Sequence, residues 1–265
     1  TVAGSLPEEL VAARRLAALL RTRPASLIHA HGLSAGLQAV LARARRNLPV
    51  VCTPNLLPHA LTNGSVGALR RSAYRYALGR CDAIISASQT QREQILRFQP
   101  RAARRVVVVP YGIDARRYQD PLTVGRRRQL LGVTPTAAVV GCIADQVPPE
   151  LLRLFLDAAA DLCTRLPNLE FVIIGADPEH GPHLDMAHER GLLGATVFAR
   201  SQRHLTRLFT PLNVLVVLQP GWPGGYLALH ALVRGLGVIA LPGGETDELL
   251  RGNQLVTIAS AHQPA

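Results

Sequence analysis

The sequence contains no lysine, so all 29 of its basic residues are arginines. Against 18 acidic residues they give a formal net charge of +11. Such a charge favours anionic partners such as phosphates, nucleotides or acidic lipid headgroups, although a coding bias would also produce an all-arginine set. Aromatic residues make up only 4% of the chain, and no zinc-finger or helix-turn-helix spacing accompanies the charge. We therefore expect no nucleic-acid partner.

Cysteine is also scarce, and the four cysteines stand far apart without a CxxC or Cys/His pattern. This predicts buried free thiols in a reducing compartment and no metal site. The sequence shows no secretory signal and no unbroken apolar run of about 20 residues. We accordingly expect a cytoplasmic protein. Because the chain begins at Thr1, we also expect it to be a segment of a longer protein.

The stretch from Gln219 to Glu248 is typical of a loop, an apolar helix, a short strand and a second glycine loop. It follows an apolar run at 214–218 that is typical of a buried strand, so its first loop lies at the carboxyl end of that strand. Open α/β sheets bind their ligands at the carboxyl ends of the strands. Gly224 and Gly225 stand just ahead of the helix, where backbone N–H groups favour an anion. Tight packing between strand and helix explains the same glycines, so both interpretations stay open.

Strands and helices alternate along the whole chain, which predicts parallel sheets with helical crossovers. A charged, turn-rich segment at 116–136 interrupts the alternation, and we expect a domain boundary there that separates domains 1–120 and 121–265. In the first series we expect strands at 26–28, 48–53, 83–85 and 106–109, and helices at 6–23, 35–45, 66–79 and 89–97. In the second series we expect strands at 137–141, 170–174, 196–198 and 214–218, and helices at 150–165 and 204–209.

Five segments, in this order and spacing, resemble the motifs of the retaining nucleotide-sugar glycosyltransferases of family four, also called group 1. The segments are LIHAHG at 27–32, CDAIISAS at 81–88, VPYGID at 109–114, FVIIG at 171–175 followed by Pro178 and Glu179, and the glycine-rich stretch at 224–244. The resemblance implies the GT-B architecture, an α/β fold of two Rossmann-like domains whose parallel sheets face each other across a cleft. It further implies an acceptor-side N-terminal domain that lacks its first strand or strands, and a C-terminal domain for the nucleotide sugar.

The resemblance also implies a reaction. Enzymes of this family transfer a sugar, with retention, from a UDP- or GDP-linked donor to a glycan or lipid acceptor, as in the synthesis of cell-envelope polysaccharides and glycolipids. The nucleotide sugar is a substrate, so no cofactor is implied. Helix ends and cations hold its phosphates in the family, so no metal ion is implied either.

The charged residues of the family's donor site are replaced in this sequence. Its arginine and lysine correspond to Cys142 and Val147. Of its paired glutamates one contacts the sugar and the other the ribose hydroxyls, and they correspond to Trp222 and His230. A thiol and an isopropyl group carry no charge for the leaving phosphate, and losing a single such donor costs about 10²–10³ in rate. No catalytic residue can be assigned with these positions changed. The donor contacts that the resemblance implies are Gly141, Cys142, Trp222, Gly224, Gly225, Tyr226 and His230.

In the N-terminal domain the resemblance implies acceptor-side roles for His29, His31, Gly32 and Asn55, the last in place of a family histidine. The two histidines at a strand end serve either as acceptor or phosphate contacts or as structural caps, and the sequence leaves both open. The helix at 66–80 carries four arginines and suggests peripheral contact with an acidic inner membrane face, although a solvated helix face is the alternative. These arginines are Arg70, Arg71, Arg75 and Arg80.

Two hypotheses of function remain. The first is a divergent glycosyltransferase whose ancestral sugar transfer is weakened or lost. The second is a non-catalytic homologue that acts as a scaffold, as the partner subunit of another protein, or as a nucleotide-binding module.

Overall fold

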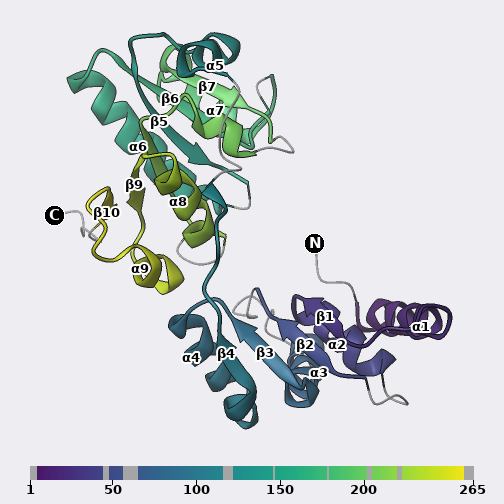
Figure 1. Ribbon diagram of the computed structural model, residues 1–265. Coiled ribbons are helices and arrows are strands. Elements are labelled where there is room, and N and C mark those ends of the chain that lie inside the picture. The colour runs from purple at the N-terminus through teal and green to yellow at the C-terminus, as the bar shows by residue number, and fades with distance from the viewer. Residues whose placement is uncertain are drawn as a thin grey trace. The chain divides into compact units, whose positions relative to one another are not determined.

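The computed structural model describes residues 5–43, 48–55, 65–115, 122–145, 147–177, 179–201, 205–219 and 223–259. The chain forms two compact units, Thr1–Tyr111 and Gly112–Ala265 (Figure 1). The expected boundary at 120/121 falls within 116–121, outside the described residues.

The N-terminal unit is built on four parallel strands in the order β1-β2-β3-β4 (Figure 1). Each strand lies beside the next one in the sequence, and the connections between them contain helices, as parallel pairing requires. The elements are α1 (Leu6–Thr22), β1 (Ile28–His31), α2 (Leu33–Ala42), β2 (Val50–Thr53), α3 (Ser65–Arg80), β3 (Ala83–Ser86), α4 (Gln89–Phe98), the 3-10 helix η1 (Pro100–Arg105) and β4 (Val106–Val108).

The core of this unit lies between the sheet and helices α2, α3 and α4. Cys52 of β2 and Ile84 of β3 are fully buried, as are Leu78 of α3 and Ile95 of α4. Helix α1 packs on α2 through Glu9, whose carboxylate accepts hydrogen bonds from Ser34 and Gln38 of α2. The pairing of a buried carboxylate with two donors satisfies a group that would otherwise be costly to bury.

The C-terminal unit contains six parallel strands in the order β10-β9-β8-β5-β6-β7. Its elements are α5 (Val124–Leu131), β5 (Ala138–Ile143), α6 (Pro149–Arg165), β6 (Leu169–Ile174), α7 (Pro182–His188), η3 (Leu193–Ala195), β7 (Thr196–Ala199), η4 (Leu205–Phe209), β8 (Val214–Val217), α8 (Gly224–Val233), β9 (Gly237–Ala240), α9 (Gly244–Leu250) and β10 (Val256–Ile258). From β5 the chain first adds β6 and β7 on one side, and then β8, β9 and β10 on the other. The order therefore reverses between β5 and β8, and this reversal is the topological switch point at which open α/β sheets bind ligands.

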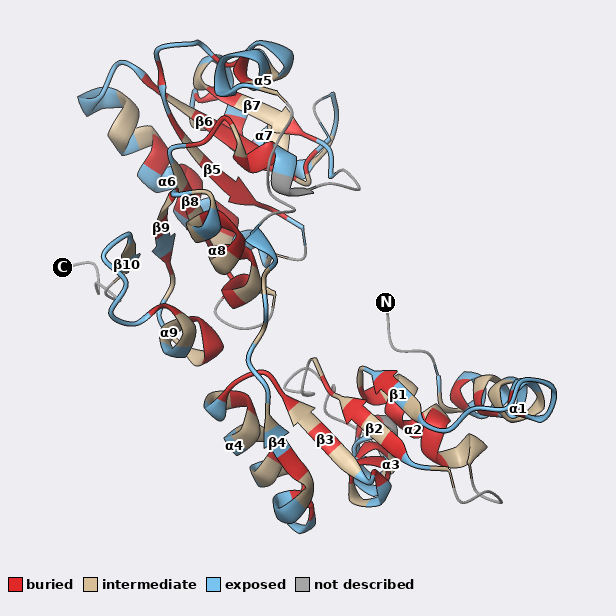
Figure 2. Cartoon of the chain, viewed as in Figure 1, coloured by how far each residue is buried: buried red, intermediate tan, exposed pale blue. Residues whose placement is uncertain are grey.

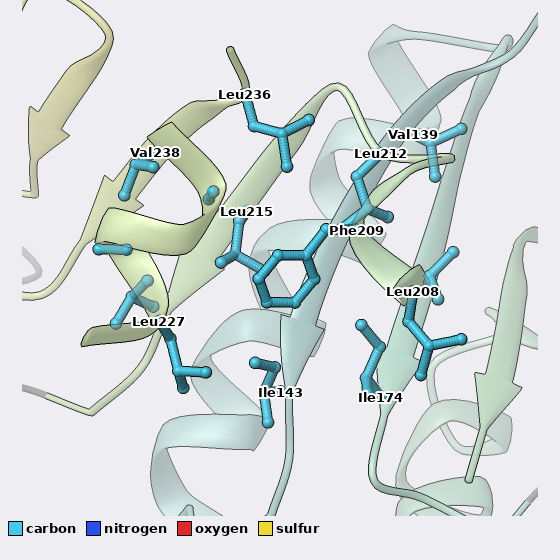
Figure 3. Packing of buried hydrophobic residues seen from close by; sticks show 14 of the residues in the cluster. Val139, Ile143, Ile174, Leu208, Phe209, Leu212, Leu215, Leu227, Leu236 and Val238 are labelled. Atoms are coloured by element: carbon cyan, nitrogen blue, oxygen red, sulfur yellow. The ribbon is translucent and has the colours of Figure 1, made fainter. Parts of the chain in front are cut away.

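Both faces of this sheet are covered. On one face Phe209 of η4 and Leu227 of α8 pack against Ile143 and Leu215 of the strands (Figure 3). On the other face α6 and α7 cover the sheet, with Phe155 of α6 set edge-on against Phe171 of β6. Figure 2 shows the result: β5 and β6 are buried over most of their length, whereas α5 is largely exposed.

The structure confirms the expected α/β fold with two parallel sheets and corrects several element boundaries. Strand β1 begins two residues later than expected, so His29 and His31 lie inside it rather than after it. Strand β5 continues to Ile143, because its pairing with β6 extends through Ile143 and Ile174. The segment 205–209 is a 3-10 helix rather than an α-helix. Helices α5 and α9 and strand β10 were not expected at all.

Among the described residues, Cys52, Cys81 and Cys142 are buried free thiols and Cys163 is a half-buried one. Within the same part of the chain, no group of three or more His, Cys, Asp or Glu side chains could hold a metal ion. None of the helices described is long and apolar enough to cross a membrane.

Candidate functional site

The switch point of the C-terminal sheet is bridged by the side chain of Gln219, two residues after β8. Its amide donates to the carbonyl oxygens of Ile143 (3.4 Å) and Asp145 (3.3 Å). Ile143 is the last residue of β5, and Asp145 lies two residues after it. Gln219 is buried, so these bonds satisfy an amide that has lost water. The side chain thus holds together the two strand ends between which the sheet order reverses.

The carboxylate of Asp145 lies at this same edge and reaches over the end of β6. Gly175, the first residue after β6, has a φ of +93°, and a Cβ added to it would lie 2.6 Å from the Asp145 carboxyl carbon. Glycine is therefore required at position 175 for two reasons: its backbone angle is strained for other residues, and a side chain would collide with Asp145. Ser201, two residues after β7, donates its hydroxyl to the Asp145 carboxylate.

A second carboxylate of this edge has a structural role. Asp177 accepts hydrogen bonds from the backbone N–H groups of Glu179 (2.9 Å) and His180 (3.3 Å), and pairs with Arg200 at 2.9 Å. The Glu179 N–H and the Arg200 guanidinium hold the pKa of Asp177 below its usual value. Asp177 thereby shapes the loop that follows β6.

The glycine pair Gly224 and Gly225 opens helix α8 directly after the β8 loop, and both residues are buried. A Cβ at Gly224 would lie 1.9 Å from the carbonyl oxygen of Gln219, and one at Gly225 would lie 2.8 Å from the side chain of Leu249 in α9. Both glycines are thus needed for packing α8 against the β8 end and against α9. Of the two interpretations of the sequence, close packing has direct support in these distances.

His230 lies two turns into α8 with only 4% of its surface exposed. Its ring meets that of Tyr226 edge-on, with centroids 4.1 Å apart. Burial lowers the pKa of His230 to about 4, so the imidazole is neutral near pH 7. A neutral imidazole carries no negative charge at the position where the sequence resemblance implies a glutamate.

Gly141 and Cys142 lie within β5 and point to opposite faces of the sheet. A Cβ at Gly141 would meet the Leu212 side chain at 2.5 Å, and the Cys142 thiol is fully buried in the core beneath α6. Burial raises the pKa of Cys142, so the thiol stays protonated. Val147 packs against the edge of the same core. Trp222 lies outside the described residues.

In the N-terminal unit, His29 and His31 lie on one face of β1, and both are exposed. Their ring centroids are 4.3 Å apart, and the Nε2 atom of His29 is 2.9 Å from the Thr53 hydroxyl of β2. Desolvation and the neighbouring His31 both lower the pKa of His29. Gly32 follows at the start of α2 with a φ of +95°, and its N–H donates to the Thr53 carbonyl at 2.8 Å. The structure therefore brings these three predicted residues together at the ends of β1 and β2.

Asn55 follows β2 in the same unit, and its backbone carbonyl accepts from the Gln91 amide at 3.4 Å. Gln91 is buried and also receives a hydrogen bond from the Ala87 N–H at 2.8 Å. The contact ties the loop after β2 to the start of α4.

The glycines of this edge were predictable from the sequence, whereas the roles of Gln219 and Ser201 were not. Each stands two residues after a parallel strand, as Asp145 does. A sequence prediction with the correct ends of β5, β7 and β8 would have shown that these three residues occupy equivalent positions. Neither residue belongs to a motif, so no pattern of residue types marked them.

Residues 2–112 match the family described as "Glycosyl transferase 4-like domain". The lipopolysaccharide core biosynthesis mannosyltransferase LpsB of Rhizobium meliloti (strain 1021) is 27% identical over an alignment of 240 residues that covers 85% of this chain and 66% of LpsB. The D-inositol 3-phosphate glycosyltransferase of Rhodococcus opacus (strain B4) is 24% identical over an alignment of 254 residues that covers 90% of this chain and 56% of that protein. The chain is a homologue of the family-four glycosyltransferases. The resemblance noted from the sequence is thereby confirmed.

Solved structures of glycosyltransferases show the same fold. Anabaena HepE in complex with UDP has a TM-score of 0.73 and 19% identity, over 93% of this chain and 68% of HepE. Sucrose-phosphate synthase from Thermosynechococcus elongatus also has a TM-score of 0.73, with 18% identity over 93% of this chain and 63% of that enzyme. The fold is thus that of the GT-B glycosyltransferases. The chain spans about 56–66% of the length of the two curated relatives.

Proposed function

We propose that this glycosyltransferase homologue binds a nucleotide sugar at the carboxyl ends of β5 and β8. The proposal rests on the switch point between β5 and β8. The Gln219 side chain links the two strand ends there, and helix α8 begins shortly after the end of β8. Ligands of open α/β sheets bind at this place, and the N-terminus of a helix favours phosphate. HepE, which shares the fold, has been solved with UDP and with UDP-glucose.

Sugar transfer in the family's manner is, in this proposal, weakened or lost. Departure of a nucleoside diphosphate needs fixed positive charge near its phosphates, and a carboxylate to balance the charge that develops on the sugar. Cys142 and Val147 stand where the resemblance implies the cations, and the Cys142 thiol is enclosed in the core. His230 stands at a glutamate position and is buried and neutral. These three substitutions support the loss of efficient transfer, and with it a role as a binding module or partner subunit.

The test separates binding from transfer. The protein is incubated with UDP-glucose and, separately, with GDP-mannose, and release of UDP or GDP is followed by ³¹P NMR over hours. We expect no release above the rate without protein, while each donor's affinity is measured in parallel. Multiple turnovers with either donor would overturn the proposed loss of transfer and leave the proposed binding intact.

We propose in addition that the N-terminal unit faces the acceptor and contacts an acidic membrane surface through α3. His29 and His31, exposed at the end of β1, support the first part. The second rests on the outer face of α3, where Leu69 and Tyr76 are 61% and 50% exposed among arginines. An apolar stripe flanked by arginines is suited to lie in the headgroup region of an anionic bilayer. A glycolipid acceptor would be reached from such a position.

A further inference from the structure

A carboxylate stands at the centre of the carboxyl edge of the C-terminal sheet, and four strand ends converge on it. Asp145 follows β5, and its side chain covers Gly175 at the end of β6. Ser201 after β7 donates to its carboxylate, and Gln219 after β8 donates to its backbone carbonyl. The backbone and side chain of Asp145 are thereby fixed by three neighbours, while the residue itself remains exposed.

This arrangement leaves Asp145 able to accept more hydrogen bonds. A carboxylate offers about four acceptor positions, and the Ser201 hydroxyl uses one of them. A phosphate placed here would meet a charge of its own sign, whereas a hydroxyl group donates to a carboxylate. In the described residues no three metal-binding side chains gather, so a lone carboxylate with a serine is unsuited to hold a divalent cation.

We propose that Asp145 is a specificity-determining residue that accepts hydrogen bonds from the ribose hydroxyls of the bound nucleotide. The proposal rests on the nucleotide-sugar binding proposed above. The resemblance implies a ribose-binding glutamate at position 230, and His230 is buried there and neutral. Asp145 supplies an exposed carboxylate at the switch point between β5 and β8, and two adjacent hydroxyl groups suit the two oxygens of a carboxylate.

The test compares the affinities of UDP and 2′,3′-dideoxy-UDP by calorimetric titration of the full chain. A hydrogen bond to a charged group corresponds to about 10- to 100-fold in affinity, so the dideoxy compound is expected to bind the wild-type protein that much more weakly. In Asp145→Ala the two compounds should differ by about threefold or less, and Asp145→Asn should fall between. The ratio of the two affinities is diagnostic, because a merely structural loss would weaken both compounds alike.

The matched control is Asp161→Asn on α6, an exposed carboxylate paired with Arg165 at 3.6 Å. It removes the same charge and should keep the wild-type ratio. Equal affinities of UDP and dideoxy-UDP for the wild-type protein, or an unchanged ratio in Asp145→Ala, would overturn the role of Asp145 alone. Failure of UDP, GDP and their 2′,3′-dideoxy forms to bind at millimolar concentration would overturn this inference together with the proposed function.

Discussion

His230 is the residue whose burial has the clearest consequence for stability. Its pKa is about 4 in the folded protein, against about 6.5 for an exposed histidine, because burial disfavours the charged ring. The unfolded chain therefore binds a proton between these two values that the folded chain does not. Stability from this group is fully present above about pH 6.5 and is lost as pH falls towards 4, to an extent of about 3 kcal/mol.

We expect His230→Gln to flatten this pH dependence. The free energy of unfolding, from urea titrations between pH 8 and pH 4.5, should fall less steeply in the variant than in the wild-type protein. His188→Gln replaces an exposed histidine of α7 and should keep the wild-type profile. Parallel profiles for His230→Gln and the wild type would show that the imidazole is not buried as described.

Individual side chains were the least predictable part of the site. The sequence placed Cys142 just after a strand, where it would face a ligand, but β5 continues past it and the thiol lies in the core. A strand end placed two residues too early therefore turned a side chain of the core into one of the loop, and within the strand a shift of one residue exchanges the two faces. The hydrogen bonds of Gln219 and Ser201 depend on residues 56 or more positions away, which no local pattern reveals.

At the scale of elements, the start of α8 depends on the lack of a side chain at Gly224. A Cβ there would lie 1.9 Å from the Gln219 carbonyl oxygen, so Gly224→Ala must displace the helix from the end of β8. We expect a loss of about 1–3 kcal/mol in unfolding free energy, by analogy with overpacked cores, and weaker binding of UDP.

Gly125→Ala in α5 is the matched control for this prediction. No atom lies within 4 Å of an added Cβ at Gly125, and alanine favours a helix over glycine by about 1 kcal/mol. This variant should therefore be at least as stable as the wild type. Equal stability of Gly224→Ala and the wild type in chemical denaturation would contradict the close packing.

Restoring the family's cation tests the position of β5. In this structure Cys142→Arg would place a guanidinium among apolar side chains beneath α6, which is expected to cost more than about 4 kcal/mol. Thermal unfolding should show a large loss of stability, whereas Cys142→Ala should cost much less. A stable Cys142→Arg protein with tighter UDP binding would instead show that position 142 faces the donor.

The alternation of elements was predictable because apolar runs and breaking residues mark it clearly. The strands and helices that were missed lack such marks. Helix α5 carries three consecutive arginines at 126–128, so its sequence lacks the spacing of apolar residues that is typical of an amphipathic helix. One of these, Arg128, is buried and donates to the carbonyls of Pro135 (2.6 Å) and Ala137 (2.9 Å), so it anchors α5 through hydrogen bonds rather than through an apolar face.

For the whole molecule, the charge of +11 makes membrane association testable. We expect the protein to sediment with vesicles that contain an anionic phospholipid and not with neutral phosphatidylcholine vesicles, and to be released by salt. Replacing Arg71 and Arg75 of α3 by glutamine should reduce binding more than replacing Arg14 and Arg15 of α1, although both pairs are exposed and the change in charge is equal. Equal losses from the two pairs would indicate non-specific attraction by net charge.

We expect this protein to keep a donor site while lacking the charges that drive transfer. The most direct test is calorimetric titration of the wild-type protein with UDP-glucose and with GDP-mannose, beside glucose and mannose alone. We predict saturable binding of at least one nucleotide sugar and none of the free sugars, because the helix start and strand ends at the switch point recognise the nucleotide and its phosphates. Absence of binding by both nucleotide sugars at millimolar concentration would contradict it.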